Sequence, residues 1–135
     1  MANTLFDFAR QRFLEGKINW MTDTIKVILV DTGVYTPQIS THQYLSDIPQ
    51  PARIAGPITL TNKTTNGGSA DADDVTFSTV SGNSVEAIVI YKDTGDESQS
   101  PLIAYLDVAT GLPVVPNDGE MVIAWDGGIN RIFRI

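Results

Sequence analysis

The chain has 135 residues, of which 42% are hydrophobic, and a formal net charge of −7. This apolar content supports a buried core in one domain and is too high for a disordered chain. The sequence has no cysteine, which excludes disulfides, zinc-thiolate sites and thiol nucleophiles. No apolar run is long enough to span a bilayer, and residues 64–126 carry one basic and eleven acidic side chains, so neither a membrane nor a nucleic acid is expected as a partner.

The first predicted element is a short helix over residues 5–15, within an N-terminal helical segment of residues 1–16. Thr4 is the expected N-cap, and Asp7 three residues later approximates a capping box. Gly16 supplies the stop. The apolar residues that share one face of this helix are Leu5, Phe6, Ala9, Phe13 and Leu14. This face is expected to dock on a sheet or on a neighbouring subunit, and both alternatives stay open.

A central strand and a long loop follow the helix. Residues 24–30 are β-branched and apolar, which is typical of a buried strand. Residues 36–51 contain three prolines and predict a long loop with a helical turn near residues 41–46. Long ordered loops are often contact surfaces.

The remainder of the chain predicts short strands separated by glycine-containing turns. The strands are expected at residues 53–55, 58–62, 74–77, 85–92, 102–107, 121–125 and 131–134. Residues 85–91 and 102–106 predict one hairpin, and residues 121–125 and 129–135 a second. The pattern indicates one mainly β domain over residues 1–135, a small antiparallel β-sandwich or barrel with a short N-terminal α-helix.

The tripeptide Asp-Thr-Gly, which begins at Asp31 and again at Asp93, is the sharpest catalytic candidate. In aspartic proteases two such aspartates face each other and share a proton. Here the second copy follows Lys92, which would place a cation beside the dyad, and the chain is too short for a two-lobed enzyme. The alternative is a pair of turns, in which aspartate binds its own backbone and glycine accepts a positive φ. We expect turns and no catalytic residue, with an aspartic-type protease acting through Asp31 as the distant alternative.

Two further candidates concern metal binding. Asp71, Asp73 and Asp74 cluster three carboxylates, but the sixth and twelfth positions of an EF-hand loop starting at Asp71 lack the required glycine and glutamate. A solvated acidic turn is the expectation, and a different kind of cation site is the alternative. His42 is the only histidine and is expected to be structural. The sequence has no phosphate-binding loop or dinucleotide motif, so no cofactor and no metal are expected.

Segments spread over nearly the whole chain resemble a family of small tailed-bacteriophage and prophage proteins. They are residues 3–7, 13–16, 18–20, 23–27, 44–49, 70–77, 86–95, 102–105, 111–113, 125–126 and 132–133. Members of this family resemble virion structural proteins encoded among head and tail genes, and no enzymatic motif accompanies them. The resemblance therefore implies a non-enzymatic structural protein of the virion.

Within a virion we favour a capsid decoration, or cement, protein, which binds and stabilises the assembled head. The expected partners are the major capsid protein or other virion subunits, together with further copies of the chain in a dimer or trimer. A low-copy neck, tail or fibre component is the alternative. The expected location is the virion, after assembly in the cytoplasm of the bacterial host. Subunit contacts are expected from the N-terminal helix and the loop, through Leu5, Phe6, Phe13, Leu14, Trp20, Tyr44 and Leu45.

Overall fold

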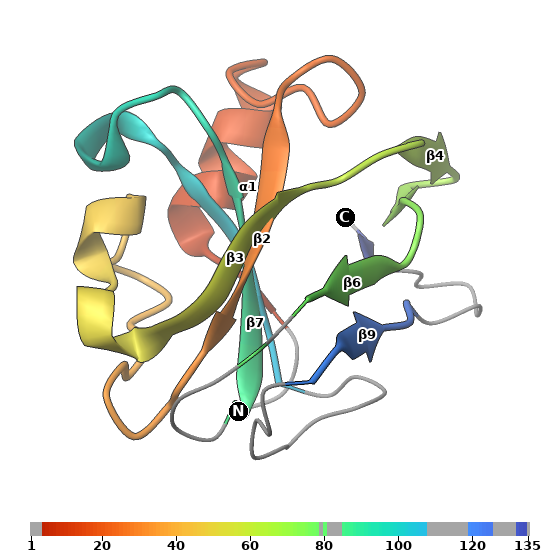
Figure 1. The fold of residues 1–135 in the computed structure, drawn as a ribbon. Coiled ribbons are helices and arrows are strands. Elements are labelled where there is room, and N and C mark those ends of the chain that lie inside the picture. Colours follow the sequence, from red (N-terminus) through yellow and green to blue (C-terminus); the bar gives the residue numbers. More distant parts are fainter. Residues whose placement is uncertain (1–3, 79, 81–84, 108–118, 126–131, 135) are drawn as a thin grey trace.

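The computed structural model describes residues 4–78, 80, 85–107, 119–125 and 132–134, and its largest element is a five-stranded antiparallel sheet (Figure 1). The strand order is β1-β8-β7-β2-β3. The strands are β1 (Thr4–Leu5), β2 (Ile25–Val30), β3 (Arg53–Thr59), β7 (Ala87–Lys92) and β8 (Leu102–Leu106). Each neighbouring pair runs antiparallel.

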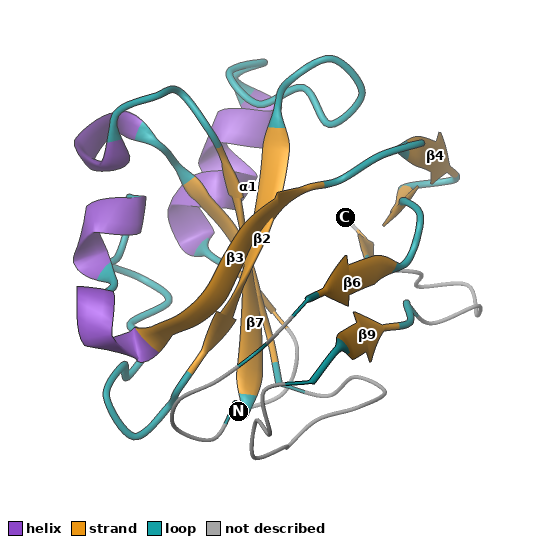
Figure 2. Ribbon diagram, in the orientation of Figure 1, coloured by secondary structure: helices purple, strands orange, loops and turns teal. Residues whose placement is uncertain are grey.

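The central strands of this sheet are buried on both faces. Almost every residue of β2, β7 and β8 is apolar and inaccessible to solvent, which is why these strands lack an alternating polar face. Helix α1 (Asp7–Leu14) packs against β8, and β6 contacts β3. In Figure 2 the helical segments lie behind and to the left of the large sheet, and β4, β6 and β9 lie to its right.

Two smaller antiparallel sheets complete the described structure. The first has the order β10-β5-β4 and comprises β4 (Thr64–Asn66), β5 (Ser69–Asp71) and β10 (Phe133–Arg134). The second pairs β6 (Val75–Phe77) with β9 (Met121–Ile123). Gly67 and Gly68 form the two-residue turn between β4 and β5, with φ angles of 58° and 90° that suit glycine.

The predicted fold class is confirmed in its main points. The chain is mainly β, its sheets are antiparallel, and one α-helix lies near the N-terminus; the arrangement is sandwich-like and is not a closed barrel. The predicted hairpin of β7 and β8 is also confirmed, with Val89 opposite Tyr105. The predicted strands at residues 53–55 and 58–62 are one strand, β3.

The predicted extent of the N-terminal helix is wrong. Thr4 and Leu5 form β1, which pairs with Tyr105 and Ala104 of β8, so backbone pairing at a sheet edge replaces the expected helical start. The N-cap is Phe6, and no side chain caps the helix. Helix α1 therefore begins at Asp7 and ends at Leu14, within the predicted range of residues 5–15.

The predicted closing hairpin is also wrong. Strand β9 pairs with β6, and β10 pairs with Ser69 and Ala70 of β5, so the two C-terminal strands belong to different sheets. Residues 126–131 and 135 of that prediction lie outside the described residues. Strands β4 and β5 were not predicted, because only their glycine turn was recognised.

The predicted loop at residues 36–51 contains more structure than expected. Two short 3-10 helices occur here, η1 (Leu45–Asp47) and η2 (Gln50–Ala52), and a third, η3 (Glu97–Gln99), lies between β7 and β8. The guanidinium of Arg53 connects these turns. It donates to the carbonyls of Leu45 (2.9 Å) and Ile48 (2.8 Å) and forms an ion pair with Glu97.

Candidate protein interaction surface

An open apolar groove of about 330 Å³ lies between the end of α1, the chain that follows it, and the β10-β5-β4 sheet. Its lining residues come from three distant parts of the sequence: Phe13, Gly16, Ile18, Asn19, Trp20, Met21, Thr65, Gly68, Ser69, Ala70 and Phe133. Such apolar hollows at a protein surface are typical of ligand or protein contact sites.

The wall that follows α1 is shaped by local backbone geometry. Gly16 has a φ of +72°, which lets the chain turn sharply after the last helical residue. The side chain of Asn19 then accepts hydrogen bonds from the backbone N–H groups of Met21 (3.0 Å) and Thr22 (3.2 Å). The carboxylate of Asp23 accepts the Asn19 N–H at 2.7 Å. This hydrogen-bonded turn fixes the direction in which Trp20 and Met21 project.

Aromatic side chains form the base of the groove. The rings of Trp20 and Phe133 meet edge to face, with centroids 5.2 Å apart, and Phe13 lies 6.0 Å from Phe133. The indole N–H of Trp20 donates to the carbonyl of Asp71 at 3.2 Å, which ties the turn to β5. Aromatic pairs in this geometry add to the stabilisation from burial. The base is therefore firmly held by the fold.

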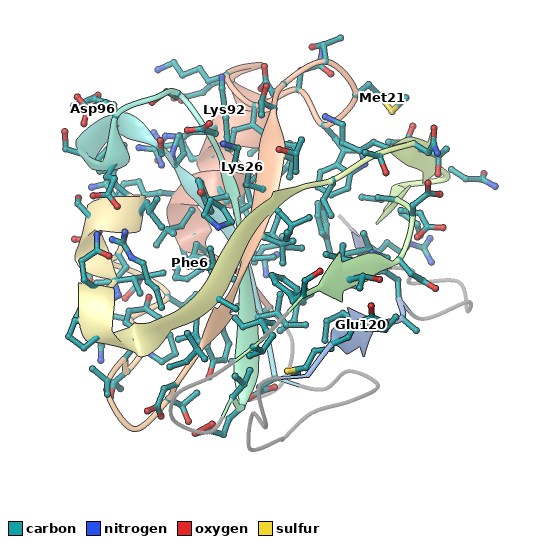
Figure 3. All side chains as sticks on the ribbon, viewed as in Figure 1. Phe6, Met21, Lys26, Lys92, Asp96 and Glu120 are labelled. Carbon is teal, nitrogen blue, oxygen red and sulfur yellow. The ribbon has the colours of Figure 1, made fainter. Side chains whose placement is uncertain are left out.

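The rim of the groove is more accessible. Met21 lines the groove and is 50% exposed. Leu14, at the end of α1, is 88% exposed but does not line the groove. Figure 3 shows Met21 at the periphery of the molecule, on the side of β4. An exposed methionine at an apolar hollow is suited to burial against another protein, because methionine adapts to differently shaped partners.

The seven residues predicted as subunit contacts fall into three groups. Leu5, Phe6, Trp20 and Leu45 are buried inside the chain, and Phe13 and Tyr44 are half-buried. Leu14 is the exposed member. The groove brings Phe13 and Trp20 together, whereas Tyr44 lies elsewhere, under the guanidinium of Arg12, which donates to its hydroxyl at 3.0 Å. Contact with another subunit stays a prediction for all seven.

Sequence reasoning missed the wall formed by β4, β5 and β10. Thr65, Gly68, Ser69, Ala70 and Phe133 line the groove, but neither β4 nor β5 has the apolar alternation of a recognisable strand. The usable signal was the pair Gly67-Gly68, because two glycines between short polar segments are typical of a two-residue hairpin turn.

The two Asp-Thr-Gly tripeptides lie at opposite ends of β2. Asp31 follows Val30 at one end, and the N–H of Asp93 donates to the carbonyl of Thr24 at the other. At roughly 3.3 Å per residue, the length of β2 separates the two aspartates by about 20 Å. They therefore do not form a dyad within one chain.

Each tripeptide is a turn in which aspartate binds its own backbone. Oδ1 of Asp31 accepts the Gly33 N–H at 2.8 Å, and Oδ1 of Asp93 accepts the Gly95 N–H at 3.0 Å. Gly95 has the expected positive φ of 88°, but Gly33 does not have a positive φ, so that detail of the prediction is wrong. Asp93 also pairs with Lys26 at 2.8 Å, and the hydrogen bond from Lys26 is the main cause of its lowered pKa.

The acidic segment after β5 is engaged in protein contacts. Asp73 accepts hydrogen bonds from the side chains of Thr61 and Asn62, and Asp74 accepts the Trp125 N–H at 3.0 Å. The indole N–H of Trp125 donates to the Asp73 carbonyl at 2.9 Å. Among the residues that the structure describes, no three carboxylate or histidine side chains are placed to hold a metal ion.

His42 is bound within the chain. Its Nδ1 lies 2.9 Å from the hydroxyl of Tyr35, and the two rings stack with centroids 5.4 Å apart. Burial raises the pKa of Tyr35, as expected for a phenol that is removed from water. The contacts made by His42 are those of a structural residue.

No helix in the described part of the chain is long and apolar enough to cross a membrane. No protein-family model and no curated protein matches the sequence.

Proposed function

We propose that this chain is a non-enzymatic structural protein of a tailed-bacteriophage virion, which works by binding other protein subunits. The most specific form of the proposal is a capsid decoration protein that binds the major capsid protein and stabilises the assembled head. The resemblance of the sequence to phage proteins supports a location in the virion. The apolar groove with its exposed rim supports binding to another protein subunit.

The observation that carries the proposal is the combination of a rigid aromatic base and an exposed apolar rim. Trp20 and Phe133 are fixed by the fold, whereas Met21 at the rim exposes apolar surface to water. Rigid aromatic anchors are common at the centres of protein interfaces, because they lose little entropy on binding. Burial of this surface against a capsid subunit would remove it from water.

A low-copy neck, tail or fibre component is the second form of the proposal, and it uses the same surface. The distant alternative is a protease that acts through Asp31. The separation of Asp31 and Asp93 leaves only a dyad formed from Asp31 of two chains, and Asp31 is engaged by Gly33 of its own turn.

The first test is the copy number of this protein in purified particles, relative to the major capsid protein, by quantitative mass spectrometry. A number close to a simple fraction of the capsid count is expected for a decoration protein. A handful of copies would assign the protein to the neck, tail or a fibre. Absence from particles would refute the structural proposal and leave a protease that acts through Asp31 as the remaining alternative.

A point substitution tests the surface itself. Met21→Glu should weaken binding to particles that lack the protein, because it places a charge at the apolar rim. Val34→Glu is the matched control, since Val34 is also apolar and 42% exposed but does not line the groove. Equal binding by the two variants would refute this surface. Deletion of residues 1–16 is a poor test, because Thr4 and Leu5 belong to the large sheet.

A further inference from the structure

Asn66 and Gly67 form the only asparagine–glycine pair in the sequence, and they lie where β4 enters its turn to β5. Both residues are exposed, and Figure 1 shows β4 at the periphery of the molecule. The side-chain amide of an asparagine can be attacked by the backbone nitrogen of the next residue. Glycine favours this attack, because it has no Cβ to hinder the approach and its backbone adopts many conformations. The pair is therefore a candidate site of chemical modification.

The attacking nitrogen of Gly67 is unobstructed. In a hairpin closed by two residues, the backbone of Asn66 bonds to Ser69, and the N–H of the first turn residue makes no bond across the strands. Within the described part of the chain, no backbone carbonyl accepts the Gly67 N–H. A Cβ placed on Gly67 would meet no atom within 4 Å apart from its chain neighbours. The space beside this backbone segment is consequently open.

The side chain of Asn66 differs from those of the two other asparagines in the described ranges. The side chain of Asn19 accepts two backbone N–H groups of its own turn, and that of Asn62 donates to the carboxylate of Asp73. Each of these two asparagines is also followed by a residue with a large side chain. The side chain of Asn66 makes no hydrogen bond to any residue that the structure describes. It is therefore free to turn towards the Gly67 nitrogen.

The reaction requires a local opening of the hairpin, and the position of Asn66 keeps this opening small. Attack needs the backbone of Asn66 to rotate out of its extended conformation, which breaks its pairing with Ser69. Strand β4 has three residues, all exposed, and it is the last strand in the order of its sheet. Short exposed segments of this kind open at low cost in free energy, and only the pair next to the turn has to separate.

We infer that Asn66 is a site of spontaneous deamidation. The Gly67 nitrogen forms a bond to Cγ of Asn66, its proton passes through water to the departing amide nitrogen, and ammonia leaves. One water molecule then opens the resulting succinimide at either carbonyl, which yields aspartate or isoaspartate. The net reaction adds water and releases ammonia, so it needs no oxidant and no second protein. The inference does not depend on the proposed function.

The isoaspartate product changes a wall of the groove. Thr65 and Gly68, on either side of the reacting pair, both line the groove. Isoaspartate carries the main chain through the former side chain and so lengthens it by one carbon, which a two-residue turn with the present register does not accommodate. Aspartate adds a negative charge but leaves the main chain unchanged. Thr65 and Gly68 are therefore expected to shift as isoaspartate accumulates in the ageing protein.

The first test follows each asparagine of the full chain during incubation at mildly alkaline pH, by peptide mapping with mass spectrometry. The readout is the mass change of an amide-to-acid conversion, relative to the protein before incubation. Conversion at Asn66 should be faster than at Asn19 and Asn62 by about tenfold or more, because their amides are bonded and their next residues are bulky. Equal rates at the three positions, or no conversion at Asn66, would overturn the inference.

Two alanine variants of the turn separate the chemistry from the opening of the hairpin. Gly67→Ala places a methyl group beside the attacking nitrogen and should slow conversion of Asn66 by about tenfold or more. Gly68→Ala is the matched control, since Gly68 also has a positive φ, of 90°, but it does not supply the attacking nitrogen. This control should keep or increase the rate of the unaltered chain. Equal slowing by the two variants would overturn the inference.

Amide hydrogen exchange of residues 64–71 tests the expected change in the groove wall. The purified isoaspartate form should exchange faster in these residues than the unaltered chain, because the register of the hairpin is lost. Asn66→Asp has the same charge as the isoaspartate form and should keep the protection of the unaltered chain. Equal protection in the two acidic forms would overturn the effect on the groove. The copy number in particles is independent of all these measurements.

Discussion

The five-stranded sheet and the β10-β5-β4 sheet divide the molecule into two kinds of β structure. In the large sheet, β2, β7 and β8 are apolar runs buried on both faces. In the small sheet, β4 is exposed along its length and β10 has two residues. The comparison teaches that long apolar strands carry the stability of this fold, whereas the short polar strand β4 contributes exposed surface beside the groove.

The largest expected effect is a cavity in the large sheet. Ile90 of β7 is fully buried, and Ile90→Ala should lower the free energy of unfolding by about 2 to 5 kcal/mol. Thr64→Ala in β4 should change it by less than about 0.5 kcal/mol, because the side chain is exposed. Urea denaturation monitored by circular dichroism measures both. Similar losses would contradict the division between the sheets.

Substitution of a glycine should likewise cost more stability in the large sheet than in the β4–β5 turn of the small sheet. A Cβ at Gly56 of β3 would lie 2.8 Å from the Val27 carbonyl oxygen, and its φ is +96°. Gly56→Ala should therefore cost about 3 kcal/mol, from strain and overpacking combined. Gly67 in the β4–β5 turn has a φ of +58° and open space around it, so Gly67→Asn should cost less than about 1 kcal/mol. Equal costs would contradict the close packing of β3 on β2.

Substitution of Arg53 measures how strongly β3 of the large sheet is bound to the neighbouring 3-10 helices. Arg53→Met removes the hydrogen bonds to Leu45 and Ile48 but keeps much of the apolar side chain. It should lower the free energy of unfolding by about 2 kcal/mol, as expected for charged hydrogen bonds in a partly buried site. Glu97→Gln should cost less than about 1 kcal/mol, because Glu97 is half exposed. A loss of similar size in both variants would assign the effect to the ion pair.

The smallest expected effect is the pH dependence from Asp93. Its hydrogen bond with Lys26 lowers the pKa of Asp93 below 3.8, so the folded state favours the charged carboxylate. The stabilisation is present above pH 3.8 and is lost as the pH falls through the lowered pKa. Asp93→Asn should cost less than about 1 kcal/mol at pH 7, and the difference should shrink in acid. A difference that stays constant down to pH 2 would contradict this origin.

At high pH, Tyr91 should add a loss of stability. Burial raises the pKa of Tyr91 to about 12, so the protonated phenol is favoured in the folded state. The stabilisation is complete below the ordinary value of 10.0 and disappears as the pH rises towards about 12. Tyr91→Phe should have a flatter stability profile over this range in denaturant titrations. An unchanged profile would assign the alkaline loss to another group.

The central strands of the large sheet were predictable because their signals are local. The runs at residues 25–30 and 87–92 are short, apolar and rich in β-branched residues, which is typical of buried strands. The turn signals between β7 and β8 indicate a hairpin. The groove was not predictable, since its walls meet only after folding: Trp20, Ala70 and Phe133 are far apart in sequence. Leu5 shows the same limit, because its apolar spacing suits a helix and pairing with β8 makes it a strand.

The two tryptophans of the chain hold opposite ends of one short segment. The indole of Trp20 binds the carbonyl of Asp71, and the indole of Trp125 binds the carbonyl of Asp73. This segment joins β5 of one small sheet to β6 of the other. Tryptophan fluorescence therefore reports whether the segment between the two smaller sheets keeps its contacts, while circular dichroism is dominated by the five-stranded sheet. An emission shift that precedes the loss of ellipticity would reveal a partly opened state, in which the five-stranded sheet persists while the two smaller sheets have separated.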